Sequence, residues 1–504
     1  MVPEDDSHLV RERRAKAERL RQDGHEPFPW EFPHRVPTTI VVERARTLSK
    51  GSTESHPPLR VGGRVGAIRS HGGTSFVDLS DQAGDLQLIL RPDHMGEERY
   101  RYWLAQLDPG DILGADGFAA LSRRGEPSLE VRGLTMLAKA LAPPPEKFHG
   151  LKDPEDRLRR RYAELLSSRE TRERFHARFS LVRAIREFPQ AREFVEVETP
   201  VLVPVASGAT AEPFRTTSNY LAEELQLRIS IELHLKRLLV GGFERVFEVG
   251  RTFRNEDLDS THSPEFTELE LYWAYADYSD MQRLVQDLYV DLAHRATALL
   301  PGLPGPQAAA EAFQPPFATI DWVSTLEERS GIRDIMGKGR DELFRLTQAA
   351  HIVVAADATE AKLLDKLFEH YVEPTLLKPT FALDFPVVTS PLAKRHRKLP
   401  GRIERFEVYY QGFEIGNAYT ELNDPDEQEQ RFREQLSRRA EDAYAMDADF
   451  IQALRFGMPP ATGFGVGVDR LVMAFLGIPS IKDVILFPMV RGKAGPGGTD
   501  SASG

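Results

Sequence analysis

The chain has 504 residues, of which 41% are hydrophobic and 28% charged, and this length is enough for about three domains. It has no cysteine, which excludes disulfides and cysteine-ligated zinc. Its net charge of −12 does not exclude a nucleic-acid partner, because phosphate contacts depend on local basic patches. No apolar run approaches about 18 residues and the acidic N-terminus is unlike a signal peptide, so we expect a cytoplasmic enzyme.

Residues 1–50 predict a helical extension, with one helix between Asp6 and Gly24 that Ser7 can cap. The helix is dense in basic side chains, which either contact nucleic-acid phosphates or form an ordinary solvated face. The pattern leaves both interpretations open. The side chains are Arg11, Arg13, Arg14, Lys16, Arg19 and Arg21.

Residues 51–145 predict a small β-barrel. Five short strands punctuated by glycine lie between Arg60 and Leu141, with one helical interruption near Glu97–Gln106. This pattern favours an OB-fold, although many β-domains share it.

We expect residues 146–168 to be a linker between domains, because the preceding run APPP (142–145) is stiff and typical of such connections. A larger α+β domain is expected at 169–491. It opens with Arg169–Gln190, whose apolar residues recur at helical spacing, and with Phe194–Pro200, which predicts a strand ending in proline.

The segment 246–273 predicts an antiparallel hairpin whose loop, Asp257–Pro264, is rich in Asp, Ser, Thr and Pro. Both strands alternate, so one face is apolar and the other is crowded with charge. Such a face is costly as ordinary surface and is better explained as the floor of a site. It carries Arg254, Glu256, Glu268, Glu270 and Tyr272.

The part after this hairpin is mainly helical. Asp277–Leu300 predicts a helix, and 301–375 predicts a proline- and alanine-rich connection followed by a helical insertion. The insertion shows no residues that indicate chemistry.

A second hairpin is expected at 406–425, with its turn at Gln411-Gly412. Asn417, Tyr419 and Glu421 share one face, whereas Glu414 has the opposite parity and needs a β-bulge to turn inward.

The run GFGVG in the segment 457–488 is not a dinucleotide fingerprint, because its third glycine comes too early and no acidic residue follows at about 20 residues. The tail at 492–504 predicts disorder.

Arg254, Glu256 and Phe266 have the spacing of motif 2 of class II aminoacyl-tRNA synthetases, and the wording FRNE…HSPEFTELELYWAYADY resembles the lysyl-tRNA synthetase branch. The helix and strand that end at Pro200 resemble motif 1, and GMPPATGFGVGVDR resembles motif 3. The resemblance implies an α+β fold, in which an OB-fold anticodon-binding barrel precedes a catalytic domain made of an antiparallel sheet flanked by helices. It also implies a homodimer built on motif 1.

The resemblance further implies an enzyme that activates L-lysine with ATP and transfers it to the 3′ end of tRNA(Lys), with Arg254 and Arg470 as catalytic residues. The residues implied to bind ATP are Arg254, Glu256, His262, Phe266, Glu407, Glu414 and Arg470, with Mg²⁺ on Glu407 and Glu414. Those implied to bind lysine are Gly208, Glu232, Glu270, Tyr272, Asn417, Tyr419 and Glu421. Those implied to bind the anticodon are Phe76, Gln87 and Glu126.

Several positions depart from the family pattern and indicate a divergent copy. Thr261 replaces a phosphate-binding arginine, and the other departures are Pro189, Glu193, Ser207, Glu212 and Ile231. Two alternatives follow: a paralogue that passes lysine or an analogue to an acceptor other than tRNA, and a catalytically inactive tRNA-binding regulator. The barrel argues against the first. The retained Arg254, Glu256, Glu407, Glu414 and Arg470 argue against the second.

Overall fold

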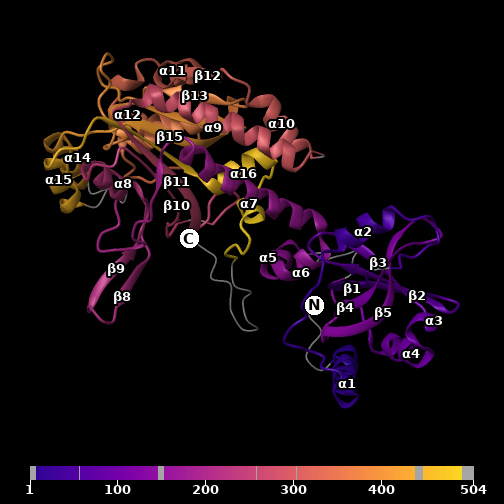
Figure 1. Ribbon diagram of the computed structural model, residues 1–504. Helices are drawn as coiled ribbons and strands as arrows, with labels where there is room; N and C mark the ends of the chain where they lie inside the picture. Colours follow the sequence, from indigo (N-terminus) through magenta and orange to yellow (C-terminus); the bar gives the residue numbers. More distant parts are fainter. Residues whose placement is uncertain are drawn as a thin grey trace. The chain divides into compact units, whose positions relative to one another are not determined.

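Figure 1 shows the computed structural model of the chain, which describes residues 7–55, 57–145, 153–209, 211–256, 258–301, 303–437 and 446–490. The chain divides into two compact units, one of residues 1–152 with 162–167 and one of residues 153–161 with 168–504. The start of the predicted N-terminal extension, residues 146–152 of the predicted linker and the tail at 492–504 lie outside the described residues.

The first unit contains a closed β-barrel with the strand order β1-β2-β3-β5-β4, as the strand pattern predicted. Its strands are β1 (Leu59–His71), β2 (Thr74–Ser80), β3 (Asp85–Leu90), β4 (Ile112–Leu121) and β5 (Pro127–Ala138). Its helices are α1 (His8–Gln22), α2 (Thr38–Arg46), α3 (Pro92–Met95) and α4 (Glu97–Gln106), and α6 (Arg161–Ser167) lies mostly in this unit. The predicted helical interruption is α4.

Helix α1 starts where the sequence predicts, because the Ser7 hydroxyl accepts a hydrogen bond from the Val10 amide. Two of its basic residues are structural. Arg13 is buried and donates to the Ala140 carbonyl oxygen at 2.9 Å, and Lys16 is 2.8 Å from the Asp108 carboxylate. The phosphate-binding interpretation is therefore wrong for the buried Arg13, and it stays a prediction for Lys16, whose side chain is partly exposed.

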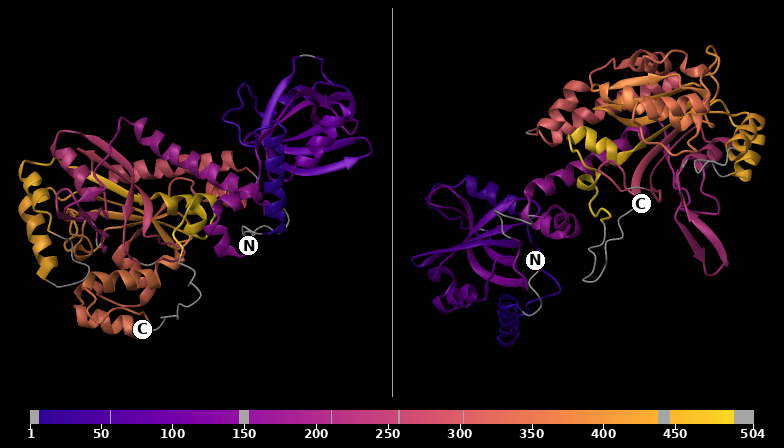
Figure 2. Two further views of the ribbon diagram at one scale, coloured as in Figure 1. Left: turned by 90° about the horizontal axis from the view of Figure 1, so that it is seen from below. Right: turned by 180° about the vertical axis from the view of Figure 1, so that it is seen from behind.

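The second unit is built on an eight-stranded sheet with the order β12-β13-β14-β15-β16-β11-β10-β6. Its strands are β6 (Val195–Glu196), β10 (Arg245–Phe253), β11 (Glu265–Ala274), β12 (Ala318–Asp321), β13 (Thr380–Leu383), β14 (Arg405–Tyr410), β15 (Phe413–Thr420) and β16 (Ala461–Gly467). A small sheet of β7 (Leu202–Val203), β9 (Glu223–Leu227) and β8 (Arg215–Ser218) accompanies it, and its β8–β9 hairpin projects from the unit in Figures 1 and 2.

Helices cover both faces of the large sheet, which gives the α+β architecture that the sequence predicts. On one face α7 (Arg169–Gln190), α9 (Tyr278–Leu299), α10 (Pro304–Ala312) and α16 (Val468–Leu476) form a core with Phe247, Leu269 and Leu271. The other core includes α8 (Glu232–Val240), α11 (Trp322–Ser330), α12 (Arg340–Ala349), α13 (Glu360–Tyr371), α14 (Pro425–Ser437) and α15 (Ala448–Arg455). The short elements are α5 (Pro154–Arg159), α17 (Ile481–Val484), η1 (Ile335–Gly337), η2 (Glu373–Thr375) and η3 (Val387–Thr389).

Two local expectations need correction. The strand predicted at Phe194–Pro200 shortens to the two residues of β6, which pair in parallel with β10. The connection predicted from 301 contains the helix α10, because Pro304 occupies the first turn, where proline is tolerated.

The parity predictions are confirmed for the paired residues, whereas Glu256 lies beyond the end of β10 and is exposed. The hairpin β10–β11 pairs Glu248 with Glu270 and Val249 with Leu269, so charged and apolar residues occupy opposite faces. The register of β14–β15 shifts between Glu407 and Tyr409, which is the bulge that Glu414 requires.

Backbone conformations explain two further features of this unit. Gln411 and Gly412 have φ of 54° and 80°, which suits the predicted tight turn. Glu193 has φ of 66°, which is why glycine is expected there. No helix among the described residues has the length and apolar character needed to cross a membrane.

Candidate active site

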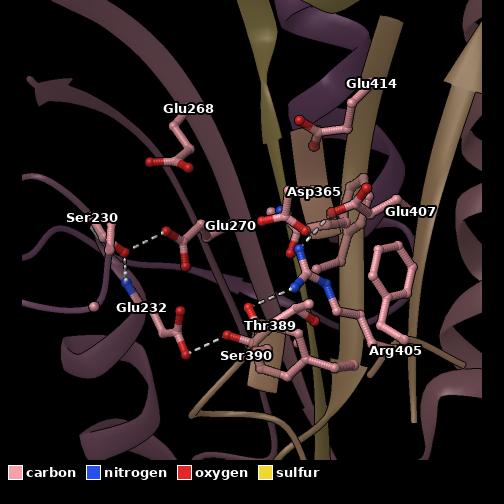
Figure 3. A pocket seen from close by; sticks show the side chains of 18 of the residues that line it. Ser230, Glu232, Glu268, Glu270, Asp365, Thr389, Ser390, Arg405, Glu407 and Glu414 are labelled. Carbon is pink, nitrogen blue, oxygen red and sulfur yellow. Dashed lines mark hydrogen bonds and ion pairs between the residues drawn. The ribbon is translucent and has the colours of Figure 1, made fainter. Parts of the chain in front are cut away.

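A cavity of about 370 Å³ lies on the charged face of the β10–β11 hairpin, and its surroundings are drawn in Figure 3. Eight carboxyl side chains line it against two guanidinium groups, so the cavity favours cationic ligands. The carboxyl groups belong to Glu232, Glu268, Glu270, Asp365, Glu369, Glu373, Glu407 and Glu414, and the guanidinium groups to Arg254 and Arg405.

Glu270 is the best-held carboxyl group of the hairpin floor. One oxygen accepts from the Ser230 hydroxyl at 3.1 Å and from the Ile231 amide at 3.2 Å, and the other accepts from the Tyr272 hydroxyl at 2.8 Å. Figure 3 shows Glu270 directed toward Ser230. Glu268 is two residues away on the same face, and one of its oxygens has no hydrogen-bond partner among the described residues.

The electrostatics of this floor favour a bound cation. Burial raises the pKa of Glu270 well above its ordinary range, and the charges of Glu268 and Glu232 raise it further. Burial also raises the pKa of Glu268, although the Arg254 guanidinium opposes the shift. These carboxyl groups have fewer positive partners than negative charges, so an ammonium group of a ligand bound here would be stabilised by them.

Helix α8 contributes a second carboxyl group, Glu232, at its first position. Its Oε1 atom accepts from Lys236 Nζ at 2.5 Å and from the Tyr419 hydroxyl at 2.6 Å. Lys236 also forms an ion pair with Glu421, and the side chains of Lys236 and Glu421 are fully buried. Glu421 therefore lies behind the cavity lining.

The opposite wall comes from β14 and β15. Arg405 donates to Glu407 at 2.5 Å, and the Tyr409 hydroxyl donates to the other Glu407 oxygen (Figure 3 marks the first bond). Glu414 reaches the same cavity from β15 because of the bulge. Burial raises the pKa of Glu407 against the opposing charge of Arg405.

Metal binding can be tested against this donor set. Within the described ranges, no group of three or more His, Asp or Glu side chains is arranged to hold a metal ion. Glu407 and Glu414 supply two carboxylates on adjacent strands of one cavity, and Mg²⁺ commonly takes one or two carboxylates with substrate phosphates and water. The pair therefore fits a Mg²⁺ that a nucleotide shares.

A chain of polar contacts leads from Glu414 to the motif 2 loop. Arg470 Nη1 is 3.4 Å from Glu414, and Arg470 Nη2 is 2.9 Å from His262 Nε2. His262 Nδ1 is 2.9 Å from the Asp259 carboxylate. Because arginine has no acceptor, His262 must accept at Nε2 and donate from Nδ1 to Asp259. These contacts hold Arg470 of α16 against His262 of the loop, next to Thr261, where the family resemblance implies an arginine.

Sequence reasoning missed the contribution of helix α13, where it found no chemistry. Asp365, Glu369 and Phe368 of this helix line the cavity. Part of the Asp365 side chain is open to the cavity, and protein surrounds the rest. The loss of water around its carboxyl group, together with the charge of Glu407, raises the pKa of Asp365 to about 7 against the opposing charge of Arg405. The sequence feature that could have pointed to this helix is the pair Asp365 and Glu369, which are four residues apart on a helix whose other face is apolar.

Comparison with known proteins gives the same overall organisation. Residues 153–491 match the model of the family "tRNA synthetases class II (D, K and N)", and residues 59–137 match "OB-fold nucleic acid binding domain". The chain belongs to the class II tRNA synthetases.

Several relatives in this family are similar to the chain over nearly its whole length. The lysine–tRNA ligase of Roseiflexus castenholzii is 44% identical over 488 residues, which cover 96% of this chain and 99% of that protein. The lysine–tRNA ligase of Moorella thermoacetica is 43% identical over 498 residues, with 98% and 100% covered. The lysine–tRNA ligase of Thermotoga maritima is 43% identical over 485 residues, with 96% of each covered.

Most of the site residues that the synthetase resemblance implied come together in the cavity. These residues are Gly208, Glu232, Arg254, Glu270, Tyr272, Glu407, Glu414, Asn417 and Tyr419. The others lie outside its lining. Glu256 is exposed, and Phe266 is half-buried with the Arg254 guanidinium 5.2 Å from its ring centre. His262 and Arg470 connect to the cavity through Glu414.

The residues implied to bind an anticodon lie on the barrel of this class II synthetase. Phe76 is half-buried on the outer side of β2, whereas its neighbour Val77 is fully buried in the barrel core. Gln87 lies on β3 opposite Asp78, and Glu126 is exposed before β5.

Proposed function

We propose that this class II synthetase is a lysine–tRNA ligase, which activates L-lysine with ATP and then transfers it to tRNA(Lys). The observation that carries the proposal is the cavity, where a cluster of buried carboxyl groups lies beside Arg254 on the motif 2 hairpin. The lysine–tRNA ligases that resemble the chain over nearly its full length support the same activity.

The amino-acid end of the site suits a lysine side chain. A lysine ammonium is a compact charge with three donors, and burying it requires several acceptors. Glu232 and Glu270 provide buried carboxylate oxygens, and Tyr272, Asn417 and Tyr419 complete the surrounding wall. A neutral amino acid would leave Glu270 without an opposite charge, which is the physical basis for rejecting it. We assign Gly208 to the backbone approach to the substrate, because its φ of 90° favours glycine.

The nucleotide end is proposed on the family match and on the positive groups near the cavity. Arg254 would bind the α-phosphate and the substrate carboxylate, and His262 and Arg470 would bind the β- and γ-phosphates. Glu256 would accept from the adenine amino group, and Phe266 would stack on the ring. When bound on Glu407 and Glu414, Mg²⁺ would neutralise phosphate charge.

The proposed chemistry needs no side-chain nucleophile. A carboxylate oxygen of lysine attacks the α-phosphorus of ATP in line. Its new bond to phosphorus forms as the bond from the α-phosphorus to the bridging oxygen breaks, and pyrophosphate leaves with that oxygen. A terminal hydroxyl of tRNA then attacks the carbonyl carbon, and AMP leaves. The contributions of this chain are positioning and charge neutralisation, with Arg254 and Arg470 as the catalytic residues.

We further propose a cytoplasmic homodimer that binds the lysine anticodon through the barrel. Phe76 would stack on a base, and Gln87 and Glu126 would meet base edges. Exposed apolar side chains on α7 and β6 support a dimer: Phe179 and Val195 are each about half exposed, and β6 stands last in the sheet order.

ATP–pyrophosphate exchange with each amino acid in turn, followed by charging of total tRNA, tests the proposal. We expect lysine-dependent exchange and lysine-specific charging. Exchange without charging would favour a different acceptor, and exchange that prefers a neutral amino acid would overturn the lysine assignment. The absence of any exchange would favour the inactive tRNA-binding protein.

A further inference from the structure

A buried ion pair joins helix α7 to the start of helix α16, directly beside Arg470. Asp469 Oδ1 is 2.6 Å from Arg178 Nη1, and the side chains of Arg178 and Asp469 are 9% and 0% exposed. Asp469 is the second residue of α16, and Arg470 follows it. The proposed binding and chemistry give this carboxylate no role, so the pair needs an explanation of its own.

The second oxygen of the same carboxylate holds the motif 2 hairpin. Strand β16 ends at Gly467, which is paired with Glu268 of β11. Asp469 Oδ2 then accepts a hydrogen bond of 2.8 Å from the amide of Thr267, the adjacent residue of β11. Since Thr267 directly follows Phe266, one carboxylate fixes the start of α16 against the backbone beside the proposed adenine-stacking residue.

The position of this ion pair favours a role other than stability. Burying two charges is costly, and well-packed apolar residues of similar volume are often as stable. The pair lies between Phe266 and Arg470, which are proposed to hold the adenine and the terminal phosphates of ATP. Two contacts of the Arg470 guanidinium group, with the Thr261 carbonyl oxygen and with Glu414, are 3.4 Å long. They hold the group loosely, so the anchored start of α16 sets its position.

We propose that Asp469 and Arg178 are positioning residues of the nucleotide end of the site. Asp469 holds Arg470 and the strand beside Phe266 in one fixed arrangement, and Arg178 anchors that carboxylate to α7. Both act through Arg470 and Phe266, because neither lines the cavity. The proposal rests on the proposed function as a lysine–tRNA ligase.

Asp469→Leu is the first test, because it removes both contacts of the carboxylate and keeps a similar volume. We expect kcat/KM for ATP in pyrophosphate exchange to fall by about tenfold or more, since a misplacement of about 1 Å at a positioning contact has effects of that size. The Kd of ATP with Mg²⁺, measured by calorimetry without amino acid, should rise. The Kd of lysine should stay within about twofold, because its pocket keeps all its contacts.

Conservative variants separate positioning from loss of the fold. Asp469→Asn keeps an oxygen for the Thr267 amide and loses only the charge, so its effect on ATP should be smaller than that of Asp469→Leu. Arg178→Lys keeps the charge, and its kcat/KM for ATP should lie closer to the wild type than that of Arg178→Met.

Two further variants complete the design. Arg178→Met combined with Asp469→Leu removes both buried charges, so it should fold even if the single variants do not, and its kcat/KM for ATP should remain lowered. Arg295→Met is the matched control, because Arg295 of α9 forms a surface ion pair of 2.8 Å with Glu187 of α7 in the same unit. It should leave ATP and lysine binding unchanged.

The outcomes separate the two levels of the proposal. If the Asp469→Leu and double variants lose thermal stability but keep the ATP Kd and kcat/KM within twofold, the positioning role is wrong and the ligase function stands. If the affinities for ATP and lysine fall together, the pair supports the whole unit and the role at the nucleotide end is wrong. If the wild type shows no lysine-dependent exchange, the ligase function fails. The ATP Kd then still decides the positioning role, and equal values in the wild type and the variants overturn it.

Discussion

The side chain of Glu270 receives three hydrogen bonds from neutral donors but no direct ion pair among the described residues. A substrate ammonium would therefore supply the missing opposite charge. We predict that Glu270→Gln weakens lysine activation by roughly 2–5 kcal/mol, the range for breaking a buried charge pair. The ATP KM should change little. Pyrophosphate exchange measures both quantities, and normal lysine activation by the variant would contradict the assignment.

The same residue predicts the pH dependence of lysine binding. Burial raises the pKa of Glu270, so the ionised form that binds ammonium becomes populated only as pH rises through the raised value. The lysine KM should therefore increase as pH is lowered, and this increase should be reduced in Glu270→Gln. Glu265→Gln is the control, because Glu265 is exposed on the same strand and should leave the pH profile unchanged.

Position 463 requires glycine because neighbouring side chains leave no room for a Cβ atom. A Cβ atom at this position would lie 2.3 Å from Glu421 Oε1 and 2.4 Å from Tyr272 Cε1. We predict that Gly463→Ala lowers the free energy of unfolding by roughly 1–3 kcal/mol and raises the lysine KM, because both side chains must move. Gly467→Ala has nothing within 4 Å of the added atom and serves as the stability control. Equal thermal stability of the two variants would remove this explanation.

At the scale of single elements, alternation within a strand was readable from the sequence. The charged face of β10–β11 and the need for a bulge between Glu414 and Asn417 both followed from residue parity, and the strand pairing has both. Parity is local information, so it could be read without the fold. Helix α13 could not be placed this way, because Asp365 meets Glu407 and Glu414 only through the tertiary arrangement. For the same reason the sequence gave no sign that Glu421 pairs with Lys236.

The bulged hairpin β14–β15 carries a prediction of its own. Glu414→Gln should raise the Mg²⁺ concentration required for half-maximal exchange, because an amide is a weaker Mg²⁺ ligand than a carboxylate. Glu434→Gln, in the surface helix α14, is the control. A Mg²⁺ titration that is identical in Glu414→Gln and the wild type would exclude Glu414 from the metal site.

At the scale of the whole molecule, the exposed apolar side chains on α7 and β6 favour a partner subunit. Phe179 is 51% exposed and Val195 is 49% exposed, and symmetric pairs of one chain are the commonest assembly. We predict a dimer in light scattering at micromolar concentration, with twice the mass of one chain. Phe179→Glu should shift the population toward single chains. A wild type that scatters only as single chains would refute the dimer.

The two steps of the proposed reaction depend on different parts of the chain. Pyrophosphate exchange needs only the cavity of the catalytic unit, whereas charging also needs tRNA, which the barrel is proposed to bind. We predict that Phe76→Ala weakens tRNA(Lys) charging by roughly 1–3 kcal/mol through lost base stacking and leaves pyrophosphate exchange unchanged. Val77→Ala is the matched control: Val77 is the next residue, faces the barrel core and is fully buried, so its truncation should lower thermal stability. Phe76→Ala should leave thermal stability nearly unchanged, since its side chain is only half-buried on the outer side of β2. Equal losses in exchange and charging would mean that Phe76 supports the fold and does not bind the anticodon.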